Sequence, residues 1–127
     1  MKQIVSFGEI MIRFDAPDNL RFRQTMPGAL NATFAGAEAN VAVSIAHLGG
    51  RSRFVTVLPD NAITDACISV LAGFGVDTDL IERSESGRFG AYFVETGANQ
   101  RPSNVIYDRT GSSIALAESE TYDWDRI

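Results

Sequence analysis

The sequence predicts an α/β fold in which strands and helices alternate first and two further strands follow. Three observations support this prediction. Short runs of β-branched and aromatic residues alternate with two segments whose apolar residues recur at helical spacing. Glycine and proline clusters separate these segments where elements would end. After about residue 78, two segments alternate apolar and polar residues with no helical pattern between them, which indicates paired strands.

The chain opens with two strand-like runs, residues 4–7 and 10–14, which Gly8 separates. Because a glycine inside a strand pattern is typical of a bend or bulge, we expect one opening strand with a bend. Glycine has no Cβ, so another group could approach the backbone there. Residues 20–34 alternate only weakly and contain a Pro-Gly pair, which predicts a short hairpin or loop.

A first helix is predicted over residues 37–48. Its apolar stripe consists of Val41, Ile45 and Leu48, at positions i, i+4 and i+7, with small alanines beside it. A Gly-Gly pair follows directly and is typical of a helix end. His47 lies on the polar side near that end, where we expect a surface residue.

A strand at residues 53–58 and a second helix come next. The turn between them contains Asp60 and Asn61, either of which can cap the helix. The order up to about residue 78 is strand, helix, strand, helix, strand, which predicts a parallel sheet with right-handed crossovers. The predicted buried side of the second helix consists of Ile63, Cys67, Val70, Leu71 and Phe74.

The last two predicted strands, residues 90–96 and 104–108, are joined by a polar turn. Side chains on neighbouring strands can reach the same face, so Tyr92 and Tyr107 can lie together. Arg109 lies two residues past Tyr107 and therefore on the same side of its strand. We expect an antiparallel flap attached to the parallel sheet.

Composition narrows the function. With a net charge of -5 and a sequence pI near 4.7, the chain is unsuited to nucleic-acid binding. An acidic ligand would need a local arginine, because the overall charge repels it. The single cysteine, Cys67, rules out an internal disulfide and favours a reducing compartment. The N-terminus lacks a signal peptide and a membrane span, so a cytoplasmic location without membrane contact is expected.

The most informative segment is the run AGAEANVA at residues 35–42. Small residues around Gly36 let a ligand approach the backbone, and a helix that starts there directs its free N–H groups toward that ligand. Asn40, in the first turn, could donate to and accept from hydroxyl groups. The alternative is an ordinary amphipathic helix that begins at a glycine.

This run, closed by Leu48 and Gly49, resembles the first signature of the PfkB or ribokinase-like sugar kinases. Four other segments occur in the order of that family, and the variant is most similar to 2-keto-3-deoxygluconate kinases. The resemblance implies a ribokinase-like parallel-sheet sandwich, with residues 1–127 as its N-terminal portion and lid strands around residues 10–35 and 87–110. The four segments are Gly8-Glu9, residues 58–61, residues 75–78 and residues 107–109.

The resemblance also implies a substrate site. Gly36 and Asn40 would contact the sugar, Tyr92 and Tyr107 of the lid would lie against it, and Arg109 would bind its carboxylate. A guanidinium can hold a carboxylate through two parallel hydrogen bonds, so the chemistry is compatible. The alternatives are tyrosines that only pack and an arginine that is only a surface charge.

Two departures from the family pattern occur at Ala35, where a first glycine is usual, and at Thr64, where a glycine is common. More important, the second signature with the catalytic aspartate and the ATP site does not occur in residues 1–127. The resemblance therefore implies ATP and Mg²⁺ for the full-length protein, but no catalytic residue, cofactor or metal on this chain, which alone should be inactive.

The function expected from the resemblance is phosphoryl transfer from ATP to the primary hydroxyl of 2-keto-3-deoxygluconate. The alternatives are a fructokinase, another ribokinase-like kinase for a neutral sugar, and a truncated, non-catalytic sugar-binding module. Because part of the family sheet is absent, we also expect exposed apolar edges and association, including a homo-oligomer formed through the lid.

Overall fold

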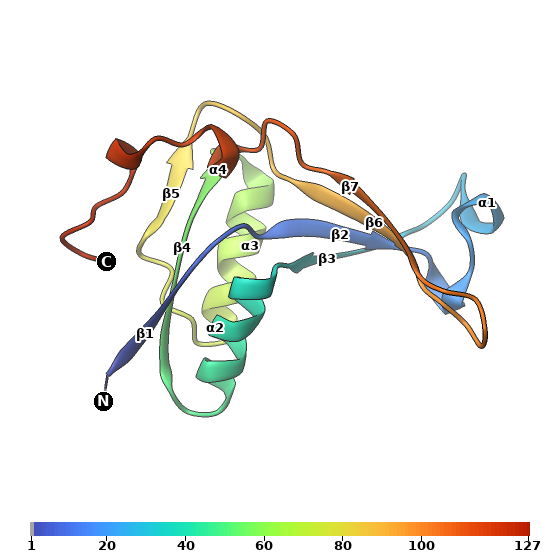
Figure 1. The fold of residues 1–127 in the computed structure, drawn as a ribbon, viewed down its shortest axis with the longest axis horizontal. Coiled ribbons are helices and arrows are strands. Elements are labelled where there is room, and N and C mark those ends of the chain that lie inside the picture. The colour runs from blue at the N-terminus through green and yellow to red at the C-terminus, as the bar shows by residue number, and fades with distance from the viewer. Residues whose placement is uncertain (1) are drawn as a thin grey trace.

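The computed structural model describes residues 2–127, which form two sheets (Figure 1). The first sheet is parallel and has three strands in the order β1-β4-β5. Its strands are β1 (Gln3–Phe7), β4 (Arg51–Pro59) and β5 (Ile81–Ser84). The predicted parallel α/β arrangement is confirmed. The third strand lies later than expected, because residue 77 forms only an isolated bridge to Arg53.

Two helices make the crossovers of the parallel sheet (Figure 1). Helix α2 (Ala37–His47) precedes β4 and packs on β1 and β4, and α3 (Ala62–Gly73) connects β4 to β5. The Asn61 side chain accepts hydrogen bonds from the N–H groups of Ile63 and Thr64, at 3.0 and 3.2 Å. This confirms the predicted cap, which satisfies two backbone donors that the helix leaves free.

The second sheet has four strands in the order β3-β2-β6-β7 and extends away from the parallel sheet (Figure 1). It pairs β2 with β3 and β6 with β7 antiparallel, but β2 with β6 parallel. The expected two-stranded flap is therefore half of a larger mixed sheet. The strands are β2 (Met11–Asp15), β3 (Asn31–Ala35), β6 (Ala91–Glu95) and β7 (Asn104–Asp108).

The opening segment differs from the expectation of one bent strand. The chain leaves the parallel sheet after β1 and enters the four-stranded sheet at β2, so Gly8 and Glu9 connect two sheets. A Cβ on Gly8 would overlap the Glu38 side chain, which shows the close approach that glycine permits. Short helical segments complete the fold: η1 (Pro17–Asn19), α1 (Phe22–Thr25), α4 (Ser113–Leu116) and η2 (Ser119–Thr121).

The core lies between the parallel sheet and its two helices. Phe54 and Leu58 of β4 and Cys67 and Leu71 of α3 are all at most 3% exposed. Burial raises the pKa of the Cys67 thiol to about 12, so the thiol remains protonated at neutral pH and acts as an apolar core group, as predicted.

The faces that α2 and α3 bury differ from the apolar stripes that the sequence predicted. In α2, Val41 and Leu48 are 52% and 85% exposed, whereas Ala39 and Ala42 are buried. Small alanines let the helix lie close to the sheet, and this close packing decides which face turns inward. In α3 the predicted Cys67 and Leu71 are buried. The other predicted residues of its buried side, Ile63, Val70 and Phe74, are exposed, and Thr64 is buried instead.

The prediction of exposed apolar edges is confirmed at β1, an edge strand of the parallel sheet. Ile4, Val5 and Phe7 are between 36% and 49% exposed. Phe7 contacts two rings of the C-terminal segment: Tyr122 in a tilted arrangement and Trp124 in a stacked one, at ring-centroid distances of 5.1 and 6.5 Å. Association, including a homo-oligomer, stays a prediction.

Across residues 2–127, no helix has the length and apolar character needed to cross a membrane.

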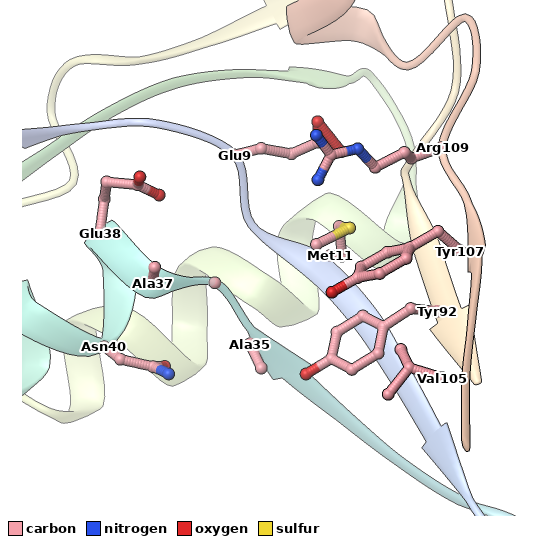
Figure 2. Close-up of a pocket in the computed structure, with 11 residues that line it drawn as sticks. Glu9, Met11, Ala35, Ala37, Glu38, Asn40, Tyr92, Val105, Tyr107 and Arg109 are labelled. Atoms are coloured by element: carbon pink, nitrogen blue, oxygen red, sulfur yellow. The ribbon is translucent and has the colours of Figure 1, made fainter. Parts of the chain in front are cut away.

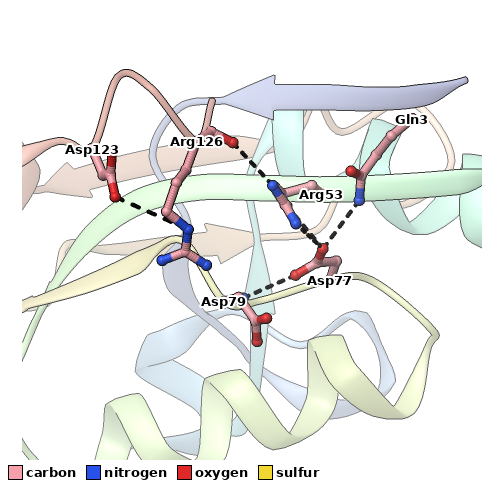
Figure 3. A network of polar contacts seen from close by, with 6 residues as sticks. All are labelled: Gln3, Arg53, Asp77, Asp79, Asp123 and Arg126. Atoms are coloured by element: carbon pink, nitrogen blue, oxygen red, sulfur yellow. Dashed lines mark hydrogen bonds and ion pairs between the residues drawn. The ribbon is translucent and has the colours of Figure 1, made fainter.

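A polar network joins the start of the parallel sheet to the segment after α3 (Figure 3). The Asp77 carboxylate accepts hydrogen bonds from Arg53 Nε at 2.8 Å and Nη2 at 2.6 Å, and from Gln3 Nε2 at 3.0 Å. Arg53 also donates to the Arg126 carbonyl at 3.1 Å. Burial alone would raise the pKa of Asp77, but the hydrogen bonds from Arg53, from the Asp79 backbone and from Gln3 lower it below 3.8.

This lowered pKa predicts acid sensitivity. Because the folded protein holds Asp77 ionised more strongly than the unfolded chain does, its stabilising effect is present above about pH 4 and is lost as pH falls through the folded-state pKa. In urea unfolding, the difference in unfolding free energy between wild type and Asp77→Asn should shrink between pH 5 and pH 2. Asp79→Asn, an exposed neighbour, is the matched control. A difference that stays constant with pH would contradict the assignment.

Candidate functional site

A cavity of about 540 Å³ lies between the start of α2 and the inner face of the four-stranded sheet (Figure 2). It brings together all the residues predicted to bind substrate: Gly36, Asn40, Tyr92, Tyr107 and Arg109. They come from two separate parts of the chain, so the fold is needed to join them. The other lining residues are Glu9, Met11, Ala35, Ala37, Glu38 and Val105.

Gly36 forms one wall of the cavity and begins α2. Its backbone is extended, with φ -172° and ψ 145°, a conformation that any residue can adopt. Space is what requires glycine: an added Cβ would overlap the Glu9 carbonyl oxygen and lie 3.2 Å from Ile10 Cα. The Gly36 carbonyl accepts a hydrogen bond from the Asn40 N–H at 2.8 Å. The first helical N–H groups remain directed at the cavity end of the helix.

Tyr92 and Tyr107 form the opposite wall. They face each other directly in the β6–β7 register, with ring centroids 5.8 Å apart and an interplanar angle of 34°. Tyr107 is 63% exposed, so its side chain is not part of the hydrophobic core. Both hydroxyl groups point across the cavity toward Ala35 and the start of α2 (Figure 2). The pair therefore offers an apolar plane and two polar tips to a ligand.

Arg109 follows β7 and lies at one end of the cavity (Figure 2). Its guanidinium carbon is 5.6 Å from the centroid of the Tyr107 ring, a cation–π distance. Within residues 2–127, no carboxylate lies within ion-pair distance of this guanidinium. Arg109 can therefore offer its N–H donors to an anionic group.

Apart from the small residues Ala35 and Ala37 beside Gly36, four lining residues were not predicted from the sequence: Glu9, Met11, Glu38 and Val105. The sequence carried signals for three of them. Glu9 follows the first parallel strand, and ligands of α/β folds bind beyond the carboxyl ends of such strands. Val105 precedes Tyr107 and Arg109 at a spacing of two, so it shares their face. Glu38 lies between Gly36 and Asn40 in the same run, two residues from each. Met11 reaches the cavity through the pairing of β2 with distant strands.

Residues assigned structural roles lie outside the cavity. His47 is exposed at the end of α2, as predicted. Thr64, where a glycine is common in the family, is buried and donates its hydroxyl to the Pro59 carbonyl at 2.5 Å.

The residues that the structure describes contain no group of three or more His, Cys, Asp or Glu side chains arranged to hold a metal ion. They therefore do not fit a Mg²⁺ site of that kind.

Comparison with known proteins decides the family. The profile of the pfkB family of carbohydrate kinases matches residues 1–127, the whole chain. The chain belongs to the pfkB family. Its architecture matches the N-terminal part of the solved kinases of this fold, which confirms the ribokinase-like α/β class.

Three relatives illustrate the range of similarity. The crystal structure of 2-dehydro-3-deoxygluconokinase from Thermotoga maritima is 47% identical, with a TM-score of 0.94, over 100% of this pfkB chain and 38% of that one. The 2-dehydro-3-deoxygalactonokinase of Haloferax volcanii is 35% identical over 93% of this chain and 36% of the relative. A fructokinase from Xylella fastidiosa, solved with bound ATP, is 30% identical with a TM-score of 0.78, over 95% of this chain and 34% of the fructokinase.

This pfkB chain thus spans a little over a third of the length of these relatives. What the geometry provides is one cavity with a helix start, an amide, two tyrosines and an arginine on its walls.

The close approach at Gly36 predicts a steric cost. Gly36→Ala should lower the unfolding free energy by about 1–3 kcal/mol, because the added methyl group forces the Glu9 backbone away from the helix start. Gly73→Ala is the matched control: it lies in α3 with nothing within 4 Å of its added Cβ, so stability should be unchanged or slightly higher. Both are measured by urea unfolding. Equal stabilities of the two variants would contradict the steric account.

Proposed function

We propose that this chain is the substrate-recognition part of an ATP-dependent kinase that phosphorylates 2-keto-3-deoxygluconate to its 6-phosphate. This substrate is the compound also called 2-dehydro-3-deoxygluconate. The observation that carries the proposal is Arg109, a guanidinium without an ion-pair partner among residues 2–127, in a cavity walled by two tyrosines and a helix start. The relatives named as kinases of 2-dehydro-3-deoxy sugar acids support it.

Each proposed contact has a physical reason. Arg109 binds the carboxylate of the sugar acid through two parallel hydrogen bonds. Tyr92 and Tyr107 lie against the carbon chain and offer their hydroxyl groups to its polar substituents. Gly36 lets the ligand approach the backbone, and Asn40 donates to and accepts from hydroxyl groups. A cavity of about 540 Å³ is in the usual range for a small-molecule site.

The four-stranded sheet acts as a lid in this proposal. It holds the tyrosines and Arg109 opposite α2, so a bound sugar would be covered on the side away from the parallel sheet (Figure 2). Covering the substrate excludes water that would otherwise compete for the phosphoryl group. In phosphoryl transfer, positioning of this kind supplies much of the catalysis.

ATP, Mg²⁺ and the catalytic aspartate belong to the other part of the protein in this proposal. The described residues provide neither an acidic cluster for the metal nor the second family signature. We therefore assign no catalytic residue and no cofactor contact to residues 1–127, and we expect the chain alone to be inactive. We also propose a cytoplasmic location, because the single cysteine of the chain allows no internal disulfide.

A kinase for a neutral sugar is the second candidate, and the similarity to a fructokinase favours it. The two candidates differ in what Arg109 does. For a sugar acid it is the main source of affinity, whereas for a neutral sugar it has no carboxylate to bind. A non-catalytic sugar-binding module would use the same contacts but would have no phosphorylating partner segment.

Substitution of Arg109 tests the proposal. Arg109→Ala should weaken binding of 2-keto-3-deoxygluconate by roughly 10- to 100-fold, because charged hydrogen bonds contribute about 1.5–3 kcal/mol. Binding is measured by titration calorimetry without ATP, with fructose as the neutral comparison ligand. Arg51→Ala is the matched control, because Arg51 is exposed at the start of β4 and pairs with the start of β1, away from the cavity.

The outcomes separate the candidates. Loss of affinity for the keto acid with Arg109→Ala, but not with Arg51→Ala, supports the sugar-acid kinase. Tight binding of fructose that survives Arg109→Ala would favour the neutral-sugar kinase instead. Unchanged keto-acid affinity in Arg109→Ala would refute the assignment of Arg109.

A further inference from the structure

Two carboxylates line the cavity, Glu9 and Glu38. Of these, Glu9 has a buried oxygen that lacks a hydrogen-bond partner. It lies between β1 and β2, where the chain passes from one sheet to the other. Its Oε2 accepts a long hydrogen bond of 3.4 Å from the hydroxyl of Ser112, which is 2% exposed. Its Oε1 is buried and has no hydrogen-bond partner. Because an unsatisfied buried carboxylate oxygen is costly, this atom needs an explanation.

The surroundings of Gly90 show where this oxygen lies. A Cβ added to Gly90 would be 2.5 Å from Glu9 Oε1 and 3.3 Å from Arg109 Cβ. The unpartnered oxygen and the base of the Arg109 side chain therefore border the same small space, which the missing side chain of Gly90 keeps open. In Figure 2 the Glu9 and Arg109 side chains extend toward each other from opposite sides of the cavity.

Arg109 has more donors than a carboxylate ligand can use. A guanidinium carries five N–H donors in a fixed plane, and a bidentate carboxylate takes two of them. Among residues 2–127, the contact recorded for the free guanidinium is the Tyr107 ring, 5.6 Å from the guanidinium carbon. A long, exposed side chain must therefore become ordered when the ligand binds. A hydrogen-bond acceptor supplied by the protein would reduce the number of orientations available to the Arg109 guanidinium.

We propose that Glu9 is a positioning residue for Arg109: in the ligand-bound protein, the guanidinium bridges Glu9 Oε1 and the carboxylate of the sugar acid. This inference rests on the proposed function and deepens it, because it assigns the acid specificity to a pair of residues. The Ser112 hydroxyl contacts Glu9 Oε2, and Oε1, which has no partner, is the acceptor that the guanidinium would use. Glu38, the second carboxylate of the cavity, is exposed and packs at Gly8 instead.

The sign of the effect makes the inference testable. If Glu9 acted only through its charge, it would repel the ligand carboxylate, and its removal would strengthen binding. As a positioning residue it strengthens binding, because it satisfies N–H donors of Arg109 that the ligand leaves free. The two roles therefore predict opposite changes in affinity.

Calorimetry with 2-keto-3-deoxygluconate measures this sign. Glu9→Met keeps the side-chain length but removes both acceptors, and should weaken binding about tenfold. Glu9→Gln keeps one acceptor without the charge, and should weaken binding about threefold. Glu118→Gln removes an exposed carboxylate outside the cavity and is the charge-matched control. Unchanged or tighter binding in Glu9→Met and Glu9→Gln would overturn the inference.

A double-mutant cycle tests whether Glu9 acts through Arg109. In the Arg109→Ala background, Glu9→Met should weaken binding no further, because the group that it positions is absent. A further tenfold loss in that background would overturn the inference, since Glu9 would then act elsewhere. Thermal unfolding of each variant checks that the changes in affinity do not come from loss of the fold.

The Arg109 Nε–H signal in NMR spectra separates this inference from the proposed function. If the keto acid does not shift that signal in the wild-type protein, the proposed role of Arg109 fails. If the ligand shifts it in the wild type, and Glu9→Met then speeds the hydrogen exchange of the bound state, the bridge is supported. An equal shift and equal exchange in wild type and Glu9→Met would overturn the role of Glu9 alone.

Discussion

The close contact between Gly36 and the backbone of Glu9 and Ile10 is the constraint on which the rest of the structure depends. At this point the chain leaves the parallel sheet, the four-stranded sheet begins and α2 starts. A side chain on Gly36 would push these three parts away from one another. The cavity exists because a missing Cβ lets a helix start lie directly against the connection between two sheets.

Much of the architecture could be predicted because its signals are local. The glycine before α2, the Asn61 cap and the β-branched run of β4 each fix an element by neighbouring residues. The parallel pairing of β2 with β6 could not be predicted in this way, because it joins segments nearly eighty positions apart. The inner faces of the helices were also misjudged, since Val41 and Leu48 are more apolar than the alanines that pack inward.

The same distinction applies to the candidate site. Tyr92, Tyr107 and Arg109 share one face through strand periodicity and direct register, which a sequence can reveal. Glu9 follows a parallel strand, which hints at a site, but its place beside Gly90 and Arg109 comes only from the folded structure. The cavity combines one guanidinium with two carboxylates, so the overall acidity of the chain extends into its binding site. In the proposed function, selection for an acidic ligand then depends on how Arg109 is oriented as well as on its charge.

The central claim is that one cavity holds a small sugar acid between the start of α2 and the four-stranded sheet. A crystal structure of the protein with 2-keto-3-deoxygluconate tests it most directly. We expect the ligand carboxylate within hydrogen-bond distance of the Arg109 guanidinium, with the carbon chain between the tyrosine rings and Gly36. A ligand bound outside this cavity, or one whose carboxylate points away from Arg109, would contradict the account.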